Sequence, residues 1–285
     1  MILITGGTGF IGTHLLEKLV YGGEAVRALV RRTRTPRAFP PGVEIAYGDL
    51  ASGAGITDAL RGVDRVIHLA GTTKALRAED YYSGNVRATE QLAHALAGRD
   101  IRLVHVSSLA AIGPSTAGMP LGEDTEPHPL THYGKSKLEA ERVVRSLVSD
   151  AVIVRPPVVY GPRDTDVFQL LKSISKGIVL EIAGGDRWFS AIYVKDLVEG
   201  LLAAASTPAA AGRAYFLAHA KAVSWRQLEV VAARIMARTP RVFTVPYGVA
   251  HAVGACAEIW ACCTGKPGIV SREKVAEARC MSCAK

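Results

Sequence analysis

A tyrosine and a lysine are spaced so that they could carry out proton transfer. Tyr133 and Lys137 lie four residues apart in a segment, His132–Leu147, whose pattern predicts a helix, so the two side chains share one helical face. A free tyrosine has a pKa of about 10 and is a poor acid–base catalyst at neutral pH. A neighbouring ammonium group favours the phenolate and tunes the hydroxyl for proton exchange with a substrate oxygen. The pair therefore indicates acid–base chemistry centred on Tyr133.

A glycine-rich segment near the first residue has the spacing of a phosphate-binding turn. Gly6, Gly9 and Gly12 lie between an apolar run, Met1–Thr5, and a helical pattern, Phe10–Tyr21. We expect Gly6 to take a tight turn, Gly9 to let the backbone approach a pyrophosphate, and Gly12 to let the helix pack closely on the strand. The pyrophosphate would meet free N–H groups at the positive end of the helix. Strand, turn and helix in this order predict binding of a nicotinamide dinucleotide.

Basic residues occupy the position where such proteins recognise the adenosine ribose. NAD-binding sites carry Asp or Glu there, after the second strand and about twenty residues past the glycines. This chain has Arg31 and Arg32, with Arg34 and Arg37 close behind. Guanidinium groups suit a 2′-phosphate because they can form two hydrogen bonds with it. The segment therefore predicts that NADP(H) is preferred over NAD(H).

These residues need a framework, and the first half of the chain supplies the pattern of one. Apolar runs predict further strands over Ala25–Val30, Val43–Tyr47, Arg65–Ala70, Ile101–Ser107 and Ala151–Arg155. Helical patterns lie between them, notably over Asp80–Ala97 and His132–Leu147. The alternation predicts an α/β fold of the Rossmann type, a doubly wound parallel sheet with helices on both faces and right-handed crossovers.

The pattern changes after Arg155, where two proline-containing pairs, Pro156-Pro157 and Gly161-Pro162, interrupt it. Later helices are predicted over Asp166–Lys176, Val194–Ser206 and Ser224–Arg238, the last with Ser224 as its N-cap. We expect residues 1–155 to form the dinucleotide-binding domain, with residues 190–215 returning to it. Residues 156–189 and 216–285 would form a smaller C-terminal substrate lobe.

Composition limits the classes of protein to consider. The chain has 285 residues, of which 49% are hydrophobic and 21% charged, as in globular proteins. Its net charge of +8 comes from cations spread along the chain, which favours phosphate ligands over nucleic acid. The most apolar segment, Val245–Thr264, contains Pro246, His251 and Glu258 and predicts no integral membrane span. It is expected to be a buried or surface-docked helix, with a peripheral membrane contact as the alternative.

The cysteines point to a reducing compartment. The chain has five, at positions 256, 262, 263, 280 and 283, and no signal-peptide pattern precedes the first predicted strand. An odd number without a secretory signal predicts free thiols in the cytoplasm. The spacing of Cys280 and Cys283 could hold zinc, but no second pair of ligands accompanies it, so we expect no metal site.

Taken together, the motifs resemble the extended branch of the short-chain dehydrogenase/reductase superfamily, the NAD-dependent epimerase/dehydratase family. Besides the glycine turn and the Tyr–Lys pair, the matching segments are His68-Leu69-Ala70-Gly71, Asn85-Val86 with Thr89, and Arg155-Pro156-Pro157-Val158-Val159-Tyr160-Gly161-Pro162. The resemblance covers nearly the whole chain. Within the family, the chain is most similar to the members of the dihydroflavonol reductase and 3β-hydroxysteroid dehydrogenase type.

The resemblance implies a Ser–Tyr–Lys catalytic set. The family's serine lies five residues before a glycine, which selects Ser108 ahead of Gly113 and leaves Ser107 as the near alternative. Ser108 would hydrogen-bond the substrate oxygen, Tyr133 would be the general acid in reduction, and Lys137 would hold the nicotinamide ribose. Asp49 is expected near the adenine. Further cofactor contacts are expected from Thr8, Phe10, Ile11, Leu50, Leu69, Ala70, Gly71, Pro156 and Val158.

Departures from the family's patterns favour one chemistry. The sugar dehydratases carry an Asp-Glu pair where this chain has Leu109-Ala110, which cannot do acid–base work. The epimerases often have Tyr where this chain has Ile112. We therefore expect an NADP(H)-dependent oxidoreductase that interconverts a carbonyl and an alcohol on a small organic substrate by hydride transfer. A nucleotide-sugar epimerase with tightly bound NAD and a non-enzymatic NAD(P)H-binding subunit are the alternatives.

Two further expectations concern partners and buried histidines. The resemblance suggests a homodimer formed through the helices predicted over Asp80–Ala97 and His132–Leu147. His68 and His105 lie in predicted buried strands and are expected to be structural rather than catalytic.

Overall fold

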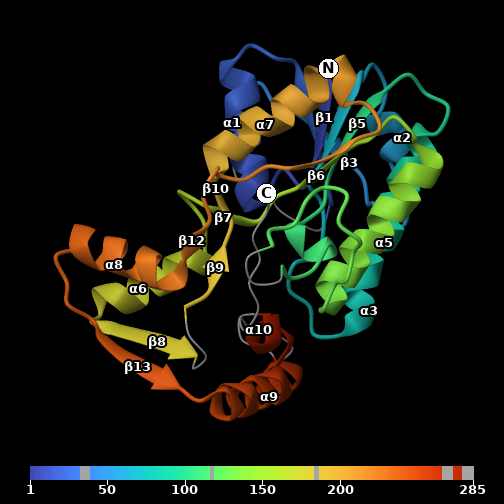
Figure 1. The fold of residues 1–285 in the computed structure, drawn as a ribbon. Coiled ribbons are helices and arrows are strands. Elements are labelled where there is room, and N and C mark those ends of the chain that lie inside the picture. The colour runs from blue at the N-terminus through green and yellow to red at the C-terminus, as the bar shows by residue number, and fades with distance from the viewer. Residues whose placement is uncertain (33–38, 116–118, 183–185, 265–271, 278–285) are drawn as a thin grey trace.

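A computed structural model describes residues 1–32, 39–115, 119–182, 186–264 and 272–277. Its centre is a seven-stranded parallel sheet with helices on both faces, and a second group of helices and short strands projects from it (Figure 1). The strand order is β11-β6-β5-β4-β1-β2-β3, so the order reverses between β1 and β4. This is the predicted Rossmann-type topology, in which ligands bind at the carboxyl ends of the strands flanking the reversal.

The predicted strands are confirmed, with ends shifted by one or two residues. They are β1 (Ile2–Thr5), β2 (Val26–Val30), β3 (Glu44–Tyr47), β4 (Arg65–His68), β5 (Arg102–Val106) and β6 (Val152–Arg155). The sequence pattern missed β11 (Ala214–Phe216), a short strand that pairs with β6 at the edge of the sheet.

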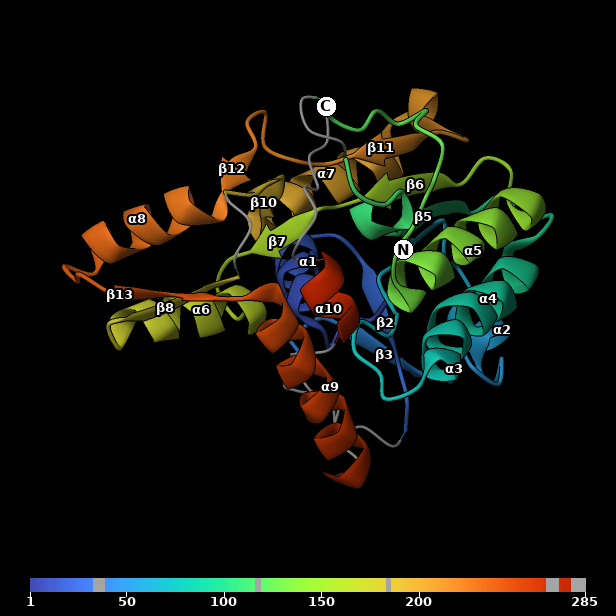
Figure 2. The same cartoon turned by 60° about the horizontal axis from the view of Figure 1, so that its bottom comes forward.

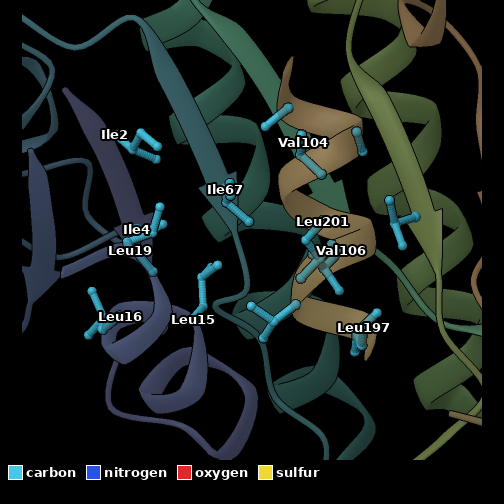
Figure 3. Close-up of a cluster of buried hydrophobic side chains, with 14 of the residues drawn as sticks. Ile2, Ile4, Leu15, Leu16, Leu19, Ile67, Val104, Val106, Leu197 and Leu201 are labelled. Carbon is cyan, nitrogen blue, oxygen red and sulfur yellow. The ribbon is translucent and has the colours of Figure 1, made fainter. Parts of the chain in front are cut away.

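Helices cover both faces of the sheet because the strand residues that point to either face are apolar. α1 (Phe10–Tyr21) and α7 (Val194–Ser206) pack on one face, against Ile2 and Ile4 of β1 (Figure 3). On the other face Leu3 packs with α2 (Ile56–Ala59), α4 (Ala88–Leu96) and α5 (His132–Leu147). Burying one such Leu or Ile side chain stabilises the fold by about 1.5–3 kcal/mol.

The helix predicted over Asp80–Ala97 is interrupted, which corrects that prediction. The segment consists of α3 (Ala78–Tyr81), a π-helical stretch η1 (Tyr82–Arg87) and α4. The buried Asn85 lies in the π-helical stretch and hydrogen-bonds the main chain of Thr72 in a neighbouring loop. Short π-helical insertions of this kind are frequent at functional sites.

The projecting group contains the remaining elements. Its members are β7 (Val158–Tyr160), α6 (Asp166–Ser175), β8 (Ile178–Ile182), β9 (Trp188–Phe189), β12 (Val223–Ser224), α8 (Trp225–Ile235), β13 (Arg241–Val245), α9 (Tyr247–Thr264) and α10 (Arg272–Glu277). β10 (Ala191–Tyr193) pairs with β7 and leads the chain back into α7. α6, α8 and β8 enclose a small apolar cluster of Ile174, Val179, Ala232 and Ala233. Ser224 caps α8 as predicted: its Oγ accepts from the Gln227 N–H. Two short 3₁₀ helices, η2 (Leu109–Ala111) and η3 (Pro208–Ala210), lie in the connections.

Candidate active site

The glycine turn joins β1 to α1 in a conformation that only glycine accommodates. Gly6 has φ +74°, and a Cβ there would lie 2.6 Å from the backbone nitrogen of Ala70. A Cβ at Gly12 would lie 2.3 Å from the Gly6 carbonyl oxygen. At Gly9 a Cβ would approach that same oxygen to 3.2 Å and no other described atom within 4 Å. The turn is therefore packed against protein at Gly6 and Gly12 and open at Gly9.

The start of α1 has the properties of an anion-binding helix end. Gly9 is its N-cap and offers no side-chain hydrogen bond, and the first turn holds no acidic residue. The helix dipole and the N–H groups of this turn attract negative charge. The turn thus fits a pyrophosphate group between Gly9 and the ends of the neighbouring strands.

A buried histidine fixes the ends of the two strands that flank the reversal in strand order. His68 Nδ1 lies 2.6 Å from Thr5 Oγ1, and its Nε2 lies 3.0 Å from Thr89 Oγ1. Burial, and secondly the charge of Lys137, lower the pKa of His68 to about 3, so the ring is neutral. His68 and His105 are both fully buried, with ring centroids 5.4 Å apart. Their surroundings suit structural side chains.

Asn85 connects the loop after β4 to α5. Its Oδ1 accepts from the Thr72 N–H at 2.7 Å, and its Nδ2 donates to Ser136 Oγ at 2.9 Å. Ser136 in turn donates to the Tyr133 carbonyl oxygen at 2.7 Å. Sequence reasoning matched Asn85 to a motif but gave it no role, and only the surrounding contacts identify it as the residue that holds this corner together.

Lys137 is buried beside this corner. Its Nζ donates to the Val106 carbonyl oxygen at 2.7 Å, at the end of β5. Burial lowers the pKa of its ammonium group to about 8, and this effect outweighs the opposing effect of the nearby Glu141 carboxylate, which raises the pKa. A Cβ placed on Gly71 would lie 3.7 Å from Nζ, so the exposed Gly71 main chain passes directly over the ammonium group.

The two candidate serines differ in accessibility. Ser108 is partly exposed and caps η2, with its Oγ accepting from the Ala110 N–H at 3.2 Å. Ser107 is 4% exposed, and its Oγ has no hydrogen-bond partner among the described residues. A Cβ on Gly134 would lie 2.3 Å from the Ala110 carbonyl oxygen, so η2 packs tightly on the first turn of α5. Tyr133 lies in that first turn, next to His132, and is partly exposed.

A buried ion pair stabilises the carboxyl end of β6, next to the site. Arg155 and Glu141, both buried, form two hydrogen bonds of 3.0 and 2.8 Å. The next residue, Pro156, is buried and accepts the Leu109 N–H on its carbonyl oxygen at 2.9 Å. The ion pair therefore ties β6 to α5, and the Pro156 hydrogen bond ties the end of β6 to η2.

The predicted ribose-reading residues lie at the ends of β2 and β3, on the same edge as the glycine turn. Arg31 and Arg32 are exposed, and the Arg32 guanidinium lies 5.2 Å from the centroid of the Tyr47 ring. Asp49 is partly exposed and accepts the Ala51 N–H on Oδ1 at 3.1 Å. Arg34 and Arg37 lie outside the described residues. The other predicted cofactor residues on this edge are partly exposed: Thr8, Phe10, Ile11, Leu50, Leu69, Ala70 and Val158.

The projecting group is anchored beside the glycine turn. The Pro162 carbonyl oxygen lies 2.8 Å from His14 Nε2, and Arg163 pairs with Glu17 at 2.7 Å, both partners being on α1. Lys74, in the loop after β4, forms an ion pair with Asp166 at the start of α6. These contacts join the glycine turn, the loop over Lys137 and the projecting group at one edge of the sheet.

No group of three or more potential metal ligands occurs among the described residues. Cys256 and Cys263 are free and exposed, whereas Cys280 and Cys283 lie beyond the described ranges. None of the helices that the structure describes is long and apolar enough to cross a bilayer.

Comparison with known proteins identifies the family. Residues 2–218 match the model of the NAD-dependent epimerase/dehydratase family. A ceramide reductase of Caulobacter vibrioides is 30% identical, over 97% of this chain and 83% of that protein. A 4-hydroxy-2-methyl-3-oxo-4-farnesyl-3,4-dihydroquinoline-1-oxide ketoreductase of Stigmatella aurantiaca is 31% identical, over 90% of this chain and 80% of that protein.

A solved structure gives the same result for the fold. MoeE5 in complex with UDP-glucose and NAD is 27% identical and superposes with a TM-score of 0.75, over 86% of this chain and 85% of that one. The family match covers most of the chain, and the seven-stranded sheet agrees with it. The chain belongs to the NAD-dependent epimerase/dehydratase family.

Proposed function

We propose that the protein is an NADP(H)-dependent reductase that interconverts a carbonyl and an alcohol. The observation that carries the proposal is the buried Lys137 ammonium group, held by Val106 below the exposed Gly71 backbone and one helical turn from Tyr133. Bound NADPH supplies the hydride, which goes to the carbonyl carbon. The Tyr133 hydroxyl donates the proton to the carbonyl oxygen, and the products are the alcohol and NADP⁺.

The hydrogen bonds of the site leave suitable donors for these roles. Ser108 Oγ already accepts from the Ala110 N–H, so its own proton remains to be donated to the substrate oxygen. Lys137 uses one N–H on Val106, which leaves two for the hydroxyls of the nicotinamide ribose. The lysine charge also favours the Tyr133 phenolate that forms after proton transfer.

The cofactor would lie along the carboxyl edge of the sheet. Gly6, Gly9 and Gly12 would hold the pyrophosphate, and Asp49 would lie near the adenine. Arg31 and Arg32 would bind the 2′-phosphate of NADP(H), which their exposure at the end of β2 permits. The remaining contacts are proposed for Thr8, Phe10, Ile11, Leu50, Leu69, Ala70, Gly71, Pro156 and Val158.

We assign the substrate to the projecting group. Residues 1–155 and 190–215 would form the cofactor domain, and residues 156–189 and 216–285 the substrate lobe. The two related reductases are named for a ceramide and for a farnesylated quinoline oxide, both of which carry long apolar chains. We therefore propose a ketone, or the matching secondary alcohol, attached to a long apolar chain.

A nucleotide-sugar epimerase with tightly bound NAD is the second candidate. The structural similarity to MoeE5, which was solved with UDP-glucose and NAD, favours it. An epimerase would be stabilised against heat by uridine nucleotides, because a ligand that binds only the folded state raises its stability. A reductase of apolar ketones would show no such effect.

We further propose a homodimer formed through residues 80–97, which span the end of α3, η1 and α4, and through α5, in a reducing cytoplasm. A groove beside these helices is lined mainly by α3 and η1, through Glu79, Tyr82, Ser83, Val86 and Arg87, and also by Glu90 of α4 and Glu139 of α5. The free, exposed thiols Cys256 and Cys263 support the compartment.

The decisive experiment titrates the purified protein with NADPH and NADH by nicotinamide fluorescence. Two charge-assisted hydrogen bonds to the 2′-phosphate contribute about 3 kcal/mol or more, so Arg31→Ala/Arg32→Ala should weaken NADPH binding at least about a hundredfold and leave NADH binding unchanged. The exposed pair Arg61→Ala/Arg99→Ala controls for net charge. Equal binding of both cofactors, or a purified protein that carries NAD, would favour the epimerase instead. Oxidation of NADPH by long-chain ketones, absent in Tyr133→Phe, then tests the reaction.

A further inference from the structure

Helix α9 carries an apolar stripe on its exposed side. Val249, Val253, Cys256, Trp260 and Cys263 are all exposed and recur at the alternating spacings of four and three residues that place them on one helical face. Val249, Val253 and Trp260 are 52%, 54% and 70% exposed. The opposite side of the helix carries buried small residues, and α10 packs against α9. The sequence had left open whether this segment is buried or docked on a surface.

The two-stranded sheet beside α9 also leaves an apolar face uncovered. β8 and β13 are parallel, and Leu180 is paired in register with Phe243, so both side chains project from the same face. They are 65% and 51% exposed, and Ile178 on the same face is 43% exposed. On the opposite face, Val179 of β8 is fully buried in the cluster with α6 and α8, whereas its partner in register, Val242 of β13, is 52% exposed.

These two uncovered faces lie on the same side of the molecule. In Figure 1, α6 and α8 lie above β8 and β13, and α10 lies above α9, so both apolar faces look toward the lower edge of the picture. Figure 2 turns that edge forward and places β13 and α9 toward the viewer. Pro246 alone separates the two elements, so the surface is continuous along the chain. We define the apolar face as Ile178, Leu180, Phe243, Val249, Val253 and Trp260.

Cations gather at the end of this face that is farthest from α9. The turns that lead into β8 and β13 lie side by side, because the Arg241 N–H donates to the Gly177 carbonyl oxygen at 2.9 Å. Five exposed cations surround these turns: Lys172, Lys176, Arg234, Arg238 and Arg241. None of the five forms an ion pair with a described residue. The acids closest in sequence are already engaged, since Asp166 pairs with Lys74, and Glu229 shares a hydrogen bond with Glu181.

We propose that this apolar face, with its cationic end, docks on the surface of a bilayer that contains anionic lipids. Exposed Leu, Val, Phe and Trp side chains would enter the boundary between headgroups and acyl chains, as in interfacial helices. The cations would meet anionic headgroups, each contributing about 1 kcal/mol. Charge complementarity selects an anionic membrane as the occupant of this face. Docking would bring the proposed substrate lobe to a ketone dissolved in the lipid, and only that last step rests on the proposed function.

Cosedimentation with lipid vesicles tests the proposal on the full chain. The protein should bind vesicles of phosphatidylcholine mixed with phosphatidylglycerol, and bind those of phosphatidylcholine alone at least about tenfold more weakly. Leu180→Ser/Phe243→Ser should lower binding at least about tenfold, because two exposed apolar side chains that would be partly buried in the membrane are lost. Lys176→Gln/Arg241→Gln should lower it about tenfold on the anionic vesicles only. The matched control is Tyr21→Ser/Ile45→Ser, which removes two exposed apolar side chains elsewhere and should leave binding unchanged.

Two outcomes would overturn the proposal. The first is a wild-type protein that binds neither vesicle, or variants that bind as well as it does. The second is a dimer in solution that Leu180→Ser/Phe243→Ser dissociates, since a second copy would then cover the face. Reduction of a water-soluble ketone by NADPH is measured in parallel on the wild type. Failure of that reaction in the wild type would remove the proposed function and leave the vesicle result standing.

Discussion

Replacing Lys137 by methionine should make the ligand-free protein more stable at neutral pH. Lys137 is 5% exposed, and burial lowers the pKa of its ammonium group from 10.5 to about 8, against the opposing effect of Glu141. The folded protein therefore holds this proton less tightly than the unfolded chain does. At about 1.4 kcal/mol per pKa unit, the charged side chain opposes folding by about 3 kcal/mol at every pH below about 8.

The pH dependence of this effect has a definite sign. As the pH rises from about 8 to about 10.5, the folded state loses the proton first, and the cost of the buried charge disappears. Methionine fills a similar volume but leaves the Val106 carbonyl without its donor, which costs about 1 kcal/mol at any pH. The variant should thus be more stable by about 2 kcal/mol below pH 8 and less stable by about 1 kcal/mol above pH 10.5.

Urea unfolding of the ligand-free proteins, repeated from about pH 7 to about pH 10.5, measures this difference. Lys135→Met is the matched control, because Lys135 lies two residues away on the exposed side of the same helix and should show no such crossover. Lys137→Met should also lose turnover and bind NADPH more weakly. A variant that is less stable than the wild type at pH 7, by an amount that does not change with pH, would refute this account of the buried lysine.

Three further predictions concern the same site. Tyr133→Phe should reduce turnover at least about a hundredfold and leave the NADPH dissociation constant unchanged, and residual activity near the wild-type level would exclude the proton-transfer role. Gly6→Ala should lower both dinucleotide affinity and the free energy of unfolding, because the new Cβ would clash with the Ala70 backbone. The control Gly23→Ala has φ +76° but nothing within 4 Å of the new Cβ, so it should cost about 1 kcal/mol of stability and no affinity. Equal effects of the two variants in calorimetry would contradict this. Glu141→Gln should cost about 3–5 kcal/mol in urea unfolding by leaving Arg155 buried without its charge partner, and a loss no larger than that of the exposed control Glu139→Gln would contradict it.

The central sheet could be predicted because its strands have apolar residues on both faces. Ile2 and Ile4 face α1 and α7, while Leu3 faces α4 and α5, so β1 appears in the sequence as an unbroken apolar run. The glycine turn was equally clear, because its spacing follows from backbone geometry within a single loop. Such local rules hold wherever the deciding contacts come from neighbours in the sequence.

Tertiary contacts decided the features that the sequence did not indicate. The break in the helix predicted over Asp80–Ala97 depends on Asn85 bonding Thr72 and Ser136, from two other segments. The apolar residues of β8 and β13 have the composition of core strands, but one of their faces is left exposed. Burial of that kind depends on which elements fold back over a strand, and the pattern of a single segment does not contain that information.

The choice between the two serines shows how a main-chain detail decides a chemical one. Both are equally good hydroxyl donors in the sequence, and both follow the end of β5. Ser107 still pairs as a strand residue, its N–H donating to the Val154 carbonyl oxygen at 2.7 Å, and its side chain is therefore directed into the sheet's packing. Ser108 is the first residue free of the sheet, and as the cap of η2 it accepts one hydrogen bond and keeps one to give. A hydroxyl that polarises a substrate oxygen needs that combination of exposure and a free proton, which is why position 108 is the better candidate.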